Sequence, residues 1–172
     1  MLPALWRMVA VVALVVLSTA TASSAFATKK AVAGAVAFDV PDDFTAAAGP
    51  PASLHEDATG ITIEVSELPL QALHEFKGAA FLEFLASRGY TNAAYAGGAL
   101  KRTDAYTYVL ADAKGKQGAE SRFLLVLGGS GRAAIVTAYA PKSQIDAGRA
   151  SRGAIETVLS SASIVPAPAT KP

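Results

Sequence analysis

Apolar and polar residues alternate most regularly over residues 60–66, where every second side chain is aliphatic. A period of two predicts a β-strand with one face toward the core and the other toward water. A second apolar run over residues 35–40 predicts another strand, and Pro41-Asp42-Asp43 after it has the composition of a turn. The pattern therefore predicts that the fold begins with β-structure.

Residues 72–88 follow a different period, because their apolar side chains recur every three or four positions. This spacing predicts an amphipathic helix that lies across a sheet. Gly89 follows the run and predicts a left-handed helix cap. The expected buried stripe consists of Leu73, Phe76, Ala80 and Phe84, with Phe81 and Leu85 on its flank.

Four strand-like runs follow, over residues 93–101, 104–113, 119–127 and 133–140. The links between them are short and rich in turn residues, which favours an antiparallel meander. The last two runs are apolar at odd and even positions alike. Both of their faces should therefore be covered, which predicts that they are the central strands.

A second helix is expected between Pro141 and about Ser161. Ser143-x-x-Asp146 resembles a capping box and gives one possible start. Glycines at positions 148 and 153 weaken the first half, so a start near Ser151 is the alternative. The side chains expected to point inward are Ile145, Ala154, Ile155, Val158 and Leu159.

The first 27 residues have the three parts of an export signal in order. Arg7 makes the start basic, residues 8–17 are apolar, and small residues continue to Ala27. Ala25-Phe26-Ala27 predicts cleavage after Ala27, with residues 20–22 as a weaker alternative. An uncleaved anchor stays open, because residues 8–27 carry no charge and are long enough to cross a bilayer about 30 Å thick.

With the leader removed, the expected organisation is a lead segment over residues 28–34, one domain over 35–165, and a disordered Pro/Ala tail over 166–172. Fourteen basic and fourteen acidic residues then remain, so the formal net charge is zero. This balance argues against binding to nucleic acid or to an anionic membrane surface. The chain has no cysteine, which excludes disulfides, thiol catalysis and thiolate metal sites. The expected location is the bacterial periplasm or the medium.

The two histidines are the first candidates for chemistry. His55 and His74 are each followed by glutamate, but neither lies in an H-E-x-x-H arrangement, which excludes that class of zinc protease. His55 with Glu56 and Asp57 has acceptable metal ligands. A solvated acidic turn is the favoured interpretation, and His74 is expected to be a surface or half-buried side chain.

The glycine-rich segment Gly128-Gly129-Ser130-Gly131-Arg132 is the second candidate. Its backbone could form an anion-binding nest beside the arginine. It lacks the spacing of a P-loop and of a nucleophile elbow, and strands flank it on both sides. A hairpin loop is therefore the favoured interpretation, with Ser130 or His55 kept as the residues of an enzyme hypothesis.

Carboxylates and tyrosines on the predicted strands are the remaining candidates. Asp104, Asp112 and Glu120 lie among lysines and arginines, which indicates a solvated edge of mixed charge. Tyr106 and Tyr108 are expected to share one strand face, as core residues or as an aromatic binding platform. No catalytic, cofactor-binding or metal-ligating residue is predicted.

The order of these elements resembles the PsbP-like family, which includes the photosystem protein PsbP and the periplasmic protein DcrB. Residues 38–44, Phe-Asp-Val-Pro-Asp-Asp-Phe, resemble the family's entry of strand, proline, acidic turn and phenylalanine. The helix ending in Arg88-Gly89-Tyr90, the meander and a closing helix before Ser163 follow in the family's order. The resemblance implies an α+β fold, an antiparallel meander with two main helices packed on it, and non-enzymatic binding or assembly.

Three hypotheses for function follow. The first is an exported, non-catalytic binding or assembly-accessory domain of the bacterial envelope, with an envelope protein as partner, no cofactor and no stable membrane insertion after cleavage. The second is a carrier of a small molecule or lipid, with a cleft between the first helix and the sheet lined by Phe76, Phe81, Phe84 and Tyr108. The third is an enzyme that uses Ser130 or His55.

Overall fold

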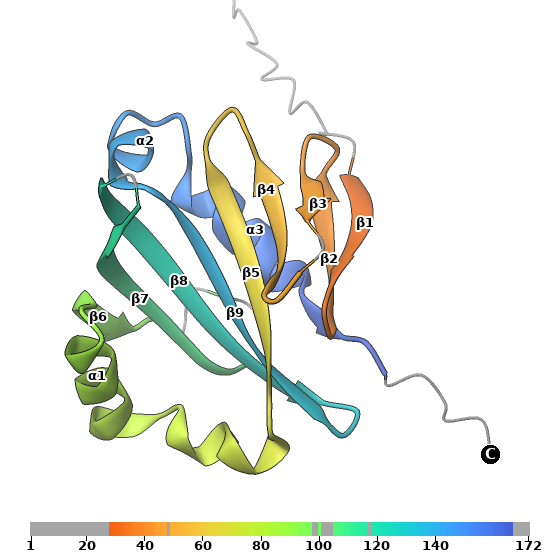
Figure 1. Cartoon of the computed structure of the whole chain (residues 1–172), viewed down its shortest axis with the longest axis vertical. Coiled ribbons are helices and arrows are strands. Elements are labelled where there is room, and N and C mark those ends of the chain that lie inside the picture. Colours follow the sequence, from red (N-terminus) through yellow and green to blue (C-terminus); the bar gives the residue numbers. More distant parts are fainter. Residues whose placement is uncertain (1–27, 48, 98–99, 101–104, 117, 167–172) are drawn as a thin grey trace, which may run out of the picture.

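The computed structural model describes residues 28–47, 49–97, 100, 105–116 and 118–166 (Figure 1). The predicted export signal, Asp104 and the last six residues lie outside this part. Among the described residues, no helix has the length and apolar content needed to cross a bilayer.

A seven-stranded antiparallel sheet is the main element, in the order β3-β4-β5-β9-β8-β7-β6. Its last four strands in sequence form the predicted meander, which confirms the α+β fold class (Figure 1). The strands are β3 (Thr45–Ala47), β4 (Ala52–Glu56), β5 (Ile61–Leu68), β6 (Thr91–Tyr95), β7 (Ala105–Gly115), β8 (Gly118–Gly129) and β9 (Arg132–Pro141).

The middle of the sheet is covered on both faces where β8 and β9 meet. Residues 123–127 of β8 are all buried, as their apolar composition predicts, and β9 is the fourth of the seven strands. The inner face packs against α3 (Arg152–Ser161) and β2 (Val36–Pro41) to form the main core. A smaller cluster on the outer face lies under α1 (Gly78–Ser87).

A second sheet joins the two ends of the domain in the order β1-β2-β10. Residues 28–34, expected to be a lead segment, contain β1 (Thr28–Ala33), which pairs with β2. On the other side of β2, β10 (Ser163–Ile164) pairs with it, and the Val165 N–H donates to the Ala35 carbonyl at 2.8 Å. Both ends of the domain are therefore held by one strand.

The second predicted helix is divided in two. α2 (Lys142–Asp146) has Pro141 at its N-cap position and no side-chain cap, so the capping box predicted at Ser143 is wrong. Gly148 separates it from α3 with φ of +70°. The alternative start near Ser151 is correct, because the Ser151 hydroxyl accepts a 2.9 Å hydrogen bond from the Ala154 N–H.

The inward face of α3 follows from this start. Ile155, Val158 and Leu159 are buried as predicted, Ile145 on α2 is half-buried, and Ala154 is exposed.

Two glycine-to-alanine substitutions test the division between α2 and α3, because they should change the free energy of unfolding in opposite directions. Gly153→Ala should stabilise the protein by about 0.5–1 kcal/mol, because Gly153 is helical and a Cβ atom there meets no neighbour. Gly148→Ala should destabilise it by about 1 kcal/mol, because its positive φ strains any L side chain. Urea unfolding of both variants measures the difference, and one continuous helix would make both substitutions stabilising.

The first predicted helix is also divided. η1 (Leu70–Glu75) is a 3₁₀ segment, and α1 begins only at Gly78, after Lys77 adopts an extended backbone. The break changes the helical phase, so the stripe predicted across residues 72–88 is wrong in part. Phe81 and Leu85 are buried, whereas Phe84 is 49 % exposed.

The end of α1 is as predicted. Gly89 has φ of +84° and its N–H donates to the Ala86 carbonyl, while the Tyr90 N–H donates to the Leu85 carbonyl. These two bonds form a Schellman cap.

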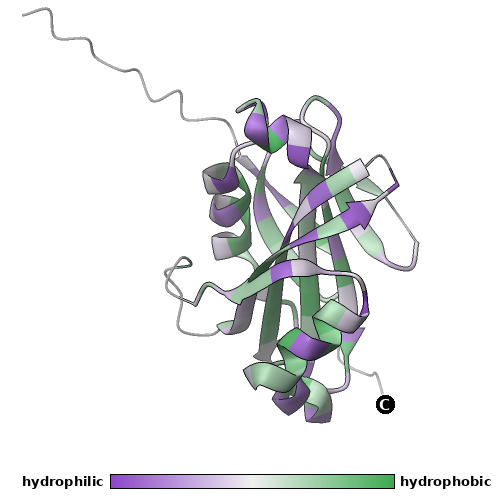
Figure 2. Ribbon diagram, turned by 90° about the vertical axis from the view of Figure 1, so that its left-hand side faces the viewer, coloured by the Kyte–Doolittle hydropathy of each residue, from purple (hydrophilic) through white to green (hydrophobic). Residues whose placement is uncertain are grey.

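The two main helices lie on opposite sides of the large sheet (Figure 2). Figure 1 looks onto the outer face, with α3 behind the sheet. The inward side chains of Ile61, Ile63 and Val65 on β5 are buried, whereas the outward side chains of this strand are half-buried or exposed. The outer face is therefore open over β4, β5 and part of β9, and this opening holds the candidate site.

Candidate functional site

A polar cavity of about 420 Å³ lies on the open outer face of the large sheet. Four of its side chains form a row across four strands, because the strand register aligns them. His55 on β4 is opposite Thr62 on β5, Thr62 is opposite Tyr139 on β9, and Tyr139 is opposite Arg122 on β8. Glu64 lies one outward position farther along β5.

Arg122 is the most constrained member of this row. Its Nε and Nη2 atoms donate to Glu120 Oε2 at 3.1 and 2.7 Å, and its Nη1 atom donates to the Tyr90 hydroxyl at 3.1 Å. The guanidinium lies 5.4 Å from the Tyr90 ring centre and 5.0 Å from that of Tyr139. Its charge is therefore neutralised and its position fixed.

Glu120 is buried, at 8 % exposure. Its carboxylate lies against Gly115, where a Cβ atom would overlap it. The glycine is thus required for the close approach of this carboxylate to the β7–β8 turn.

Tyr139 joins Arg122 to the acid on β5. Its hydroxyl donates a 2.8 Å hydrogen bond to Glu64 Oε1. Burial, followed by the hydrogen bond to Glu64, raises the pKa of Tyr139 to about 12. The hydroxyl therefore stays protonated at neutral pH and acts as a donor, not as a base.

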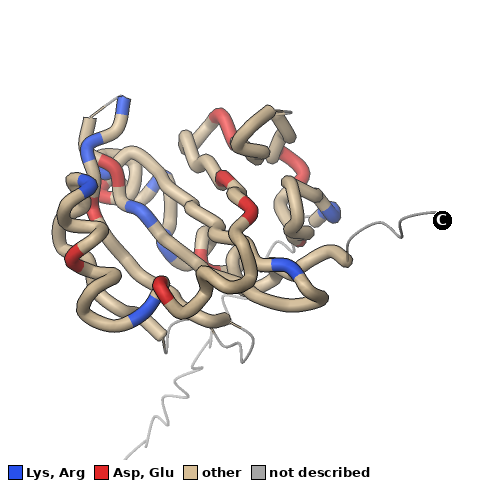
Figure 3. The backbone as a smooth tube through the Cα atoms, turned by 60° about the horizontal axis from the view of Figure 1, so that its bottom comes forward, with Lys and Arg blue, Asp and Glu red and all other residues tan. Residues whose placement is uncertain are grey.

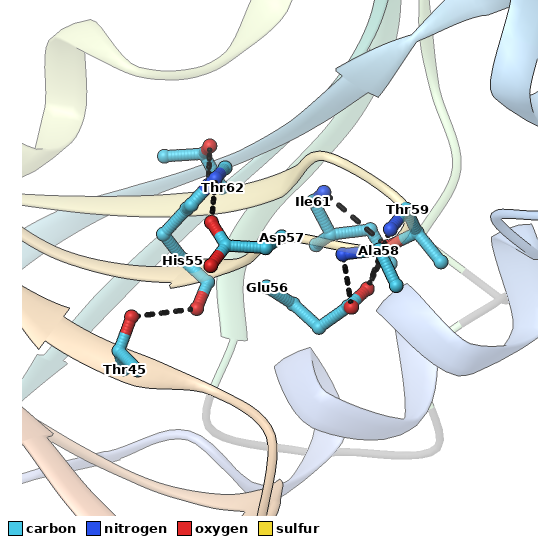
Figure 4. A network of polar contacts seen from close by, with 8 residues as sticks. All are labelled: Thr45, His55, Glu56, Asp57, Ala58, Thr59, Ile61 and Thr62. Carbon is cyan, nitrogen blue, oxygen red and sulfur yellow. Dashed lines mark hydrogen bonds and ion pairs between the residues drawn. The ribbon is translucent and has the colours of Figure 1, made fainter.

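His55 and two residues of the β4–β5 turn, Asp57 and Gly60, line the cavity. Figure 4 shows the polar contacts of His55 and this turn. His55 lies in β4, whereas the sequence predicted a turn at this position. Its Nδ1 atom is 2.8 Å from Thr62 Oγ1, and its Nε2 atom is 3.2 Å from Asp57 Oδ1. Strand alternation points His55 outward and the next residue, Glu56, inward.

The predicted solvated acidic turn is wrong for Glu56, which is 5 % exposed. Its carboxylate accepts the Ala58 N–H at 2.7 Å, the Thr59 N–H at 3.0 Å and the Thr59 hydroxyl. It is the hydrogen-bond acceptor that closes the turn (Figure 4). In the described part of the chain, no three histidine or acidic side chains are placed to hold a metal ion together.

Asp57, His55 and Thr62 form a chain of carboxylate, imidazole and hydroxyl. Acyl-transfer enzymes use this order together with free N–H groups that stabilise an oxyanion. Here β5, which carries Thr62, pairs with a strand on each side, so the backbone N–H groups around Thr62 are used in hydrogen bonds between strands. In addition, the Asp57 side chain is 92 % exposed. The chain orients His55 without assembling an acyl-transfer centre.

The glycine-rich segment is a tight hairpin, which confirms its favoured interpretation. β8 continues to Gly129 and β9 begins at Arg132, so Ser130 and Gly131 form the turn with φ of 52° and 73°. Arg132 bonds Glu67 at 2.6 Å and the Val165 carbonyl at 3.1 Å.

The hairpin is remote from His55. Arg132 and Tyr139 lie seven residues apart on β9, which corresponds to about 23 Å. Ser130 and His55 therefore cannot act in one centre. His74 is exposed on η1, with Nδ1 2.6 Å from the Gln71 carbonyl.

Asp112 and Glu120 are not a carboxylate pair. They occupy consecutive cross-strand positions and so point to opposite faces of the sheet. Asp112 forms a 2.9 Å ion pair with Lys142, as Glu120 does with Arg122, which confirms the mixed charge predicted for this edge. Glu120 differs from the prediction in being buried.

Acidification should destabilise the protein partly through Asp112. Hydrogen bonds from Asn92 and Lys142 lower the pKa of Asp112. Its contribution is therefore complete above the ordinary carboxyl pKa near 4 and is lost as pH falls below it. The melting temperature of Asp112→Asn should fall less between pH 7 and pH 3 than that of the unmodified protein. Equal losses would contradict this role.

Tyr106 and Tyr108 differ because a β-bulge lies between Ala105 and Thr107. Tyr108 is 2 % exposed and donates to Glu156 on α3, which confirms the core interpretation for this residue. Tyr106 is 36 % exposed, with the Lys77 ammonium 5.2 Å from its ring centre.

The carrier cleft predicted between the first helix and the sheet is not formed by its four residues. Phe76 and Phe81 pack edge to face with ring centres 5.3 Å apart, within the cluster under α1. Phe84 is exposed, and Tyr108 belongs to the main core.

Acidic and basic positions are interspersed over the described part of the molecule (Figure 3). The strand tyrosines predicted as candidates from the sequence include Tyr139, whereas the sequence pattern does not single out Thr62, Glu64 or Arg122 as site residues. A signal for Thr62 and Glu64 was present, since they alternate with Ile61 and Ile63 on the wet face of a predicted strand.

Comparison with known proteins gives the fold. No family model matches the chain, and no curated protein matches it. The solution structure of cyanobacterial PsbP (CyanoP) from Synechocystis sp. PCC 6803 superimposes with a TM-score of 0.53 at 13 % identity, covering 87 % of this chain and 99 % of that one. A crystal structure from Bacteroides thetaiotaomicron gives a TM-score of 0.45 at 11 % identity, over 77 % of this chain and 46 % of that one. The chain therefore has the PsbP-like fold that the order of its elements predicts.

Proposed function

We propose that this chain is a non-catalytic binding or assembly-accessory domain of the bacterial envelope, which docks a protein partner on the outer face of its large sheet. The observation that carries the proposal is the row of polar side chains across β4, β5, β9 and β8, on a sheet face that the described helices leave open. The PsbP-like fold supports the same class of function.

The state of the side chains supports binding over catalysis. Arg122, Tyr139 and His55 each have a partner within the site, and Tyr139 keeps its proton. Side chains that are already fixed lose little conformational entropy when a partner docks. A surface of this kind favours recognition of a complementary protein face.

The location in the envelope rests on the leader sequence. Cleavage after Ala27 would make Thr28 the first residue of the mature chain. An intact mass that starts at Thr28, measured on protein from the envelope fraction, would support export and cleavage, whereas the full-length mass would indicate a retained anchor.

Photo-crosslinking tests the docking face directly. A photoreactive amino acid at Ser66, which is exposed on the outer side of β5, should give one product of defined added mass in intact cells. The matched position is Thr157, exposed on α3 on the opposite side of the sheet. Products of the same kind from both positions, or from neither, would contradict docking on the outer face.

A further inference from the structure

We propose that the outer-face cavity receives a lysine or arginine side chain of the protein partner, and that the Glu64 carboxylate binds it. The inference rests on the proposed docking function and names the chemistry of the partner at this site. It depends on the position of Glu64 and on the pairing of the charges around it.

Glu64 is a half-buried acid without a cation. Its Oε1 atom accepts the Tyr139 hydroxyl at 2.8 Å, and among the described residues no lysine, arginine or histidine nitrogen lies within 4.0 Å of its carboxylate. No donor to Oε2 is found among the described residues. A carboxylate held in this way is prepared for a charge-assisted hydrogen bond.

The carboxylate is also held in place. Tyr139 lies against the Arg122 guanidinium at 5.0 Å, and Glu120 fixes that guanidinium through two of its nitrogens. The charge of Arg122 is thus paired with Glu120, and its guanidinium packs against the Tyr139 ring. The Tyr139 hydroxyl in turn orients the Glu64 carboxylate. A ligand cation would meet an ordered acceptor, so little freedom is lost on binding.

The remaining charges of the cavity leave it slightly negative. Glu120 cancels Arg122, while Glu64, Asp57 and the rim residue Lys116 sum to −1 with His55 neutral. The Asp57 side chain is largely exposed, and its Oδ1 atom lies 3.2 Å from His55 Nε2. An incoming cation is thus favoured over an anion by the charges that line the cavity.

The oxygen atoms that Glu64 and Tyr139 offer in the cavity favour an organic cation over a metal ion. In the described chain, no group of three metal-ligating side chains includes Glu64. One carboxylate beside a tyrosine hydroxyl suits an ammonium or guanidinium group, which needs only one or two acceptors. A volume of about 420 Å³ accommodates such a side chain with its stem.

A peptide titration followed by NMR tests the proposal. The probes are the N-acetylated, C-amidated tripeptides Ala-Arg-Ala and Ala-Gln-Ala, added to the purified ¹⁵N-labelled protein. The arginine peptide should shift the amide signals of Thr62, Glu64 and Tyr139 saturably, and the glutamine peptide should not. Glu64→Gln should weaken the arginine response about tenfold, since one charge-assisted hydrogen bond is lost.

Glu83→Gln is the matched control, because Glu83 is exposed on α1 and carries the same charge. It should leave the response unchanged. Equal shifts by both peptides, an unchanged response in Glu64→Gln, or no saturable shift at all would overturn the proposal. The crosslink from Ser66 distinguishes the docking proposal from the proposed contact with a cationic side chain. If the crosslink persists while the peptide test fails, docking on the outer face stands and the cationic contact is wrong.

Discussion

Replacing Phe81 with alanine should lower the free energy of unfolding by about 3–5 kcal/mol, whereas Phe84→Ala should lower it by less than about 1 kcal/mol. Phe81 is 3 % exposed and packs with Phe76, Val109 and Leu124 beneath α1. Its removal leaves a cavity between the helix and the sheet. Phe84 is 49 % exposed, so its removal leaves no cavity.

Urea unfolding of both variants measures this difference. The pair is matched in residue type and lies on the same helix, three positions apart, so helix propensity cancels. A larger effect at Phe84 than at Phe81 would restore the stripe predicted from the sequence and would contradict the helical phase of α1.

Replacing Arg122 with methionine should destabilise the protein by about 2–4 kcal/mol, because it leaves Glu120 as a buried carboxylate without a cation. The Tyr90 hydroxyl loses its donor in the same step. Arg132→Met is the matched control, since its partner Glu67 is 54 % exposed on the side chain and stays solvated. The control should cost about 1 kcal/mol or less.

A second substitution decides whether the charge is the cause. Adding Glu120→Leu to Arg122→Met should recover part of the lost stability, because the unpaired carboxylate is removed. A double variant no more stable than Arg122→Met would indicate that the loss comes from packing between the two tyrosine rings. Chemical denaturation of the unmodified protein, the single variants Arg122→Met and Glu120→Leu, and the double variant gives the coupling energy between the two side chains.

The sequence by itself determined the elements whose signals are local. Alternation placed β5, the apolar run placed β8 in the middle of the sheet, and short links predicted the meander. Gly89 marked the end of α1, and Ser130-Gly131 marked a tight hairpin. These features follow from side-chain period and from backbone conformations that few residues adopt, so a short stretch of chain carries them.

Only the tertiary structure decided where the helices break and which faces they bury. The extended backbone at Lys77 divides η1 from α1 and moves Phe84 out of the buried stripe. A bulge beside Tyr106 separates it from Tyr108. β1 forms because it pairs with β2, and no sequence pattern within residues 28–34 predicts this strand.

The candidate site was also decided at the tertiary level. Its row joins His55, Thr62, Tyr139 and Arg122, which are up to 84 positions apart in the chain. Each looks locally like an ordinary polar residue of a wet strand face. Strand register makes them neighbours, and register depends on how the whole sheet buries its opposite face, so the site exists only after the sheet has formed.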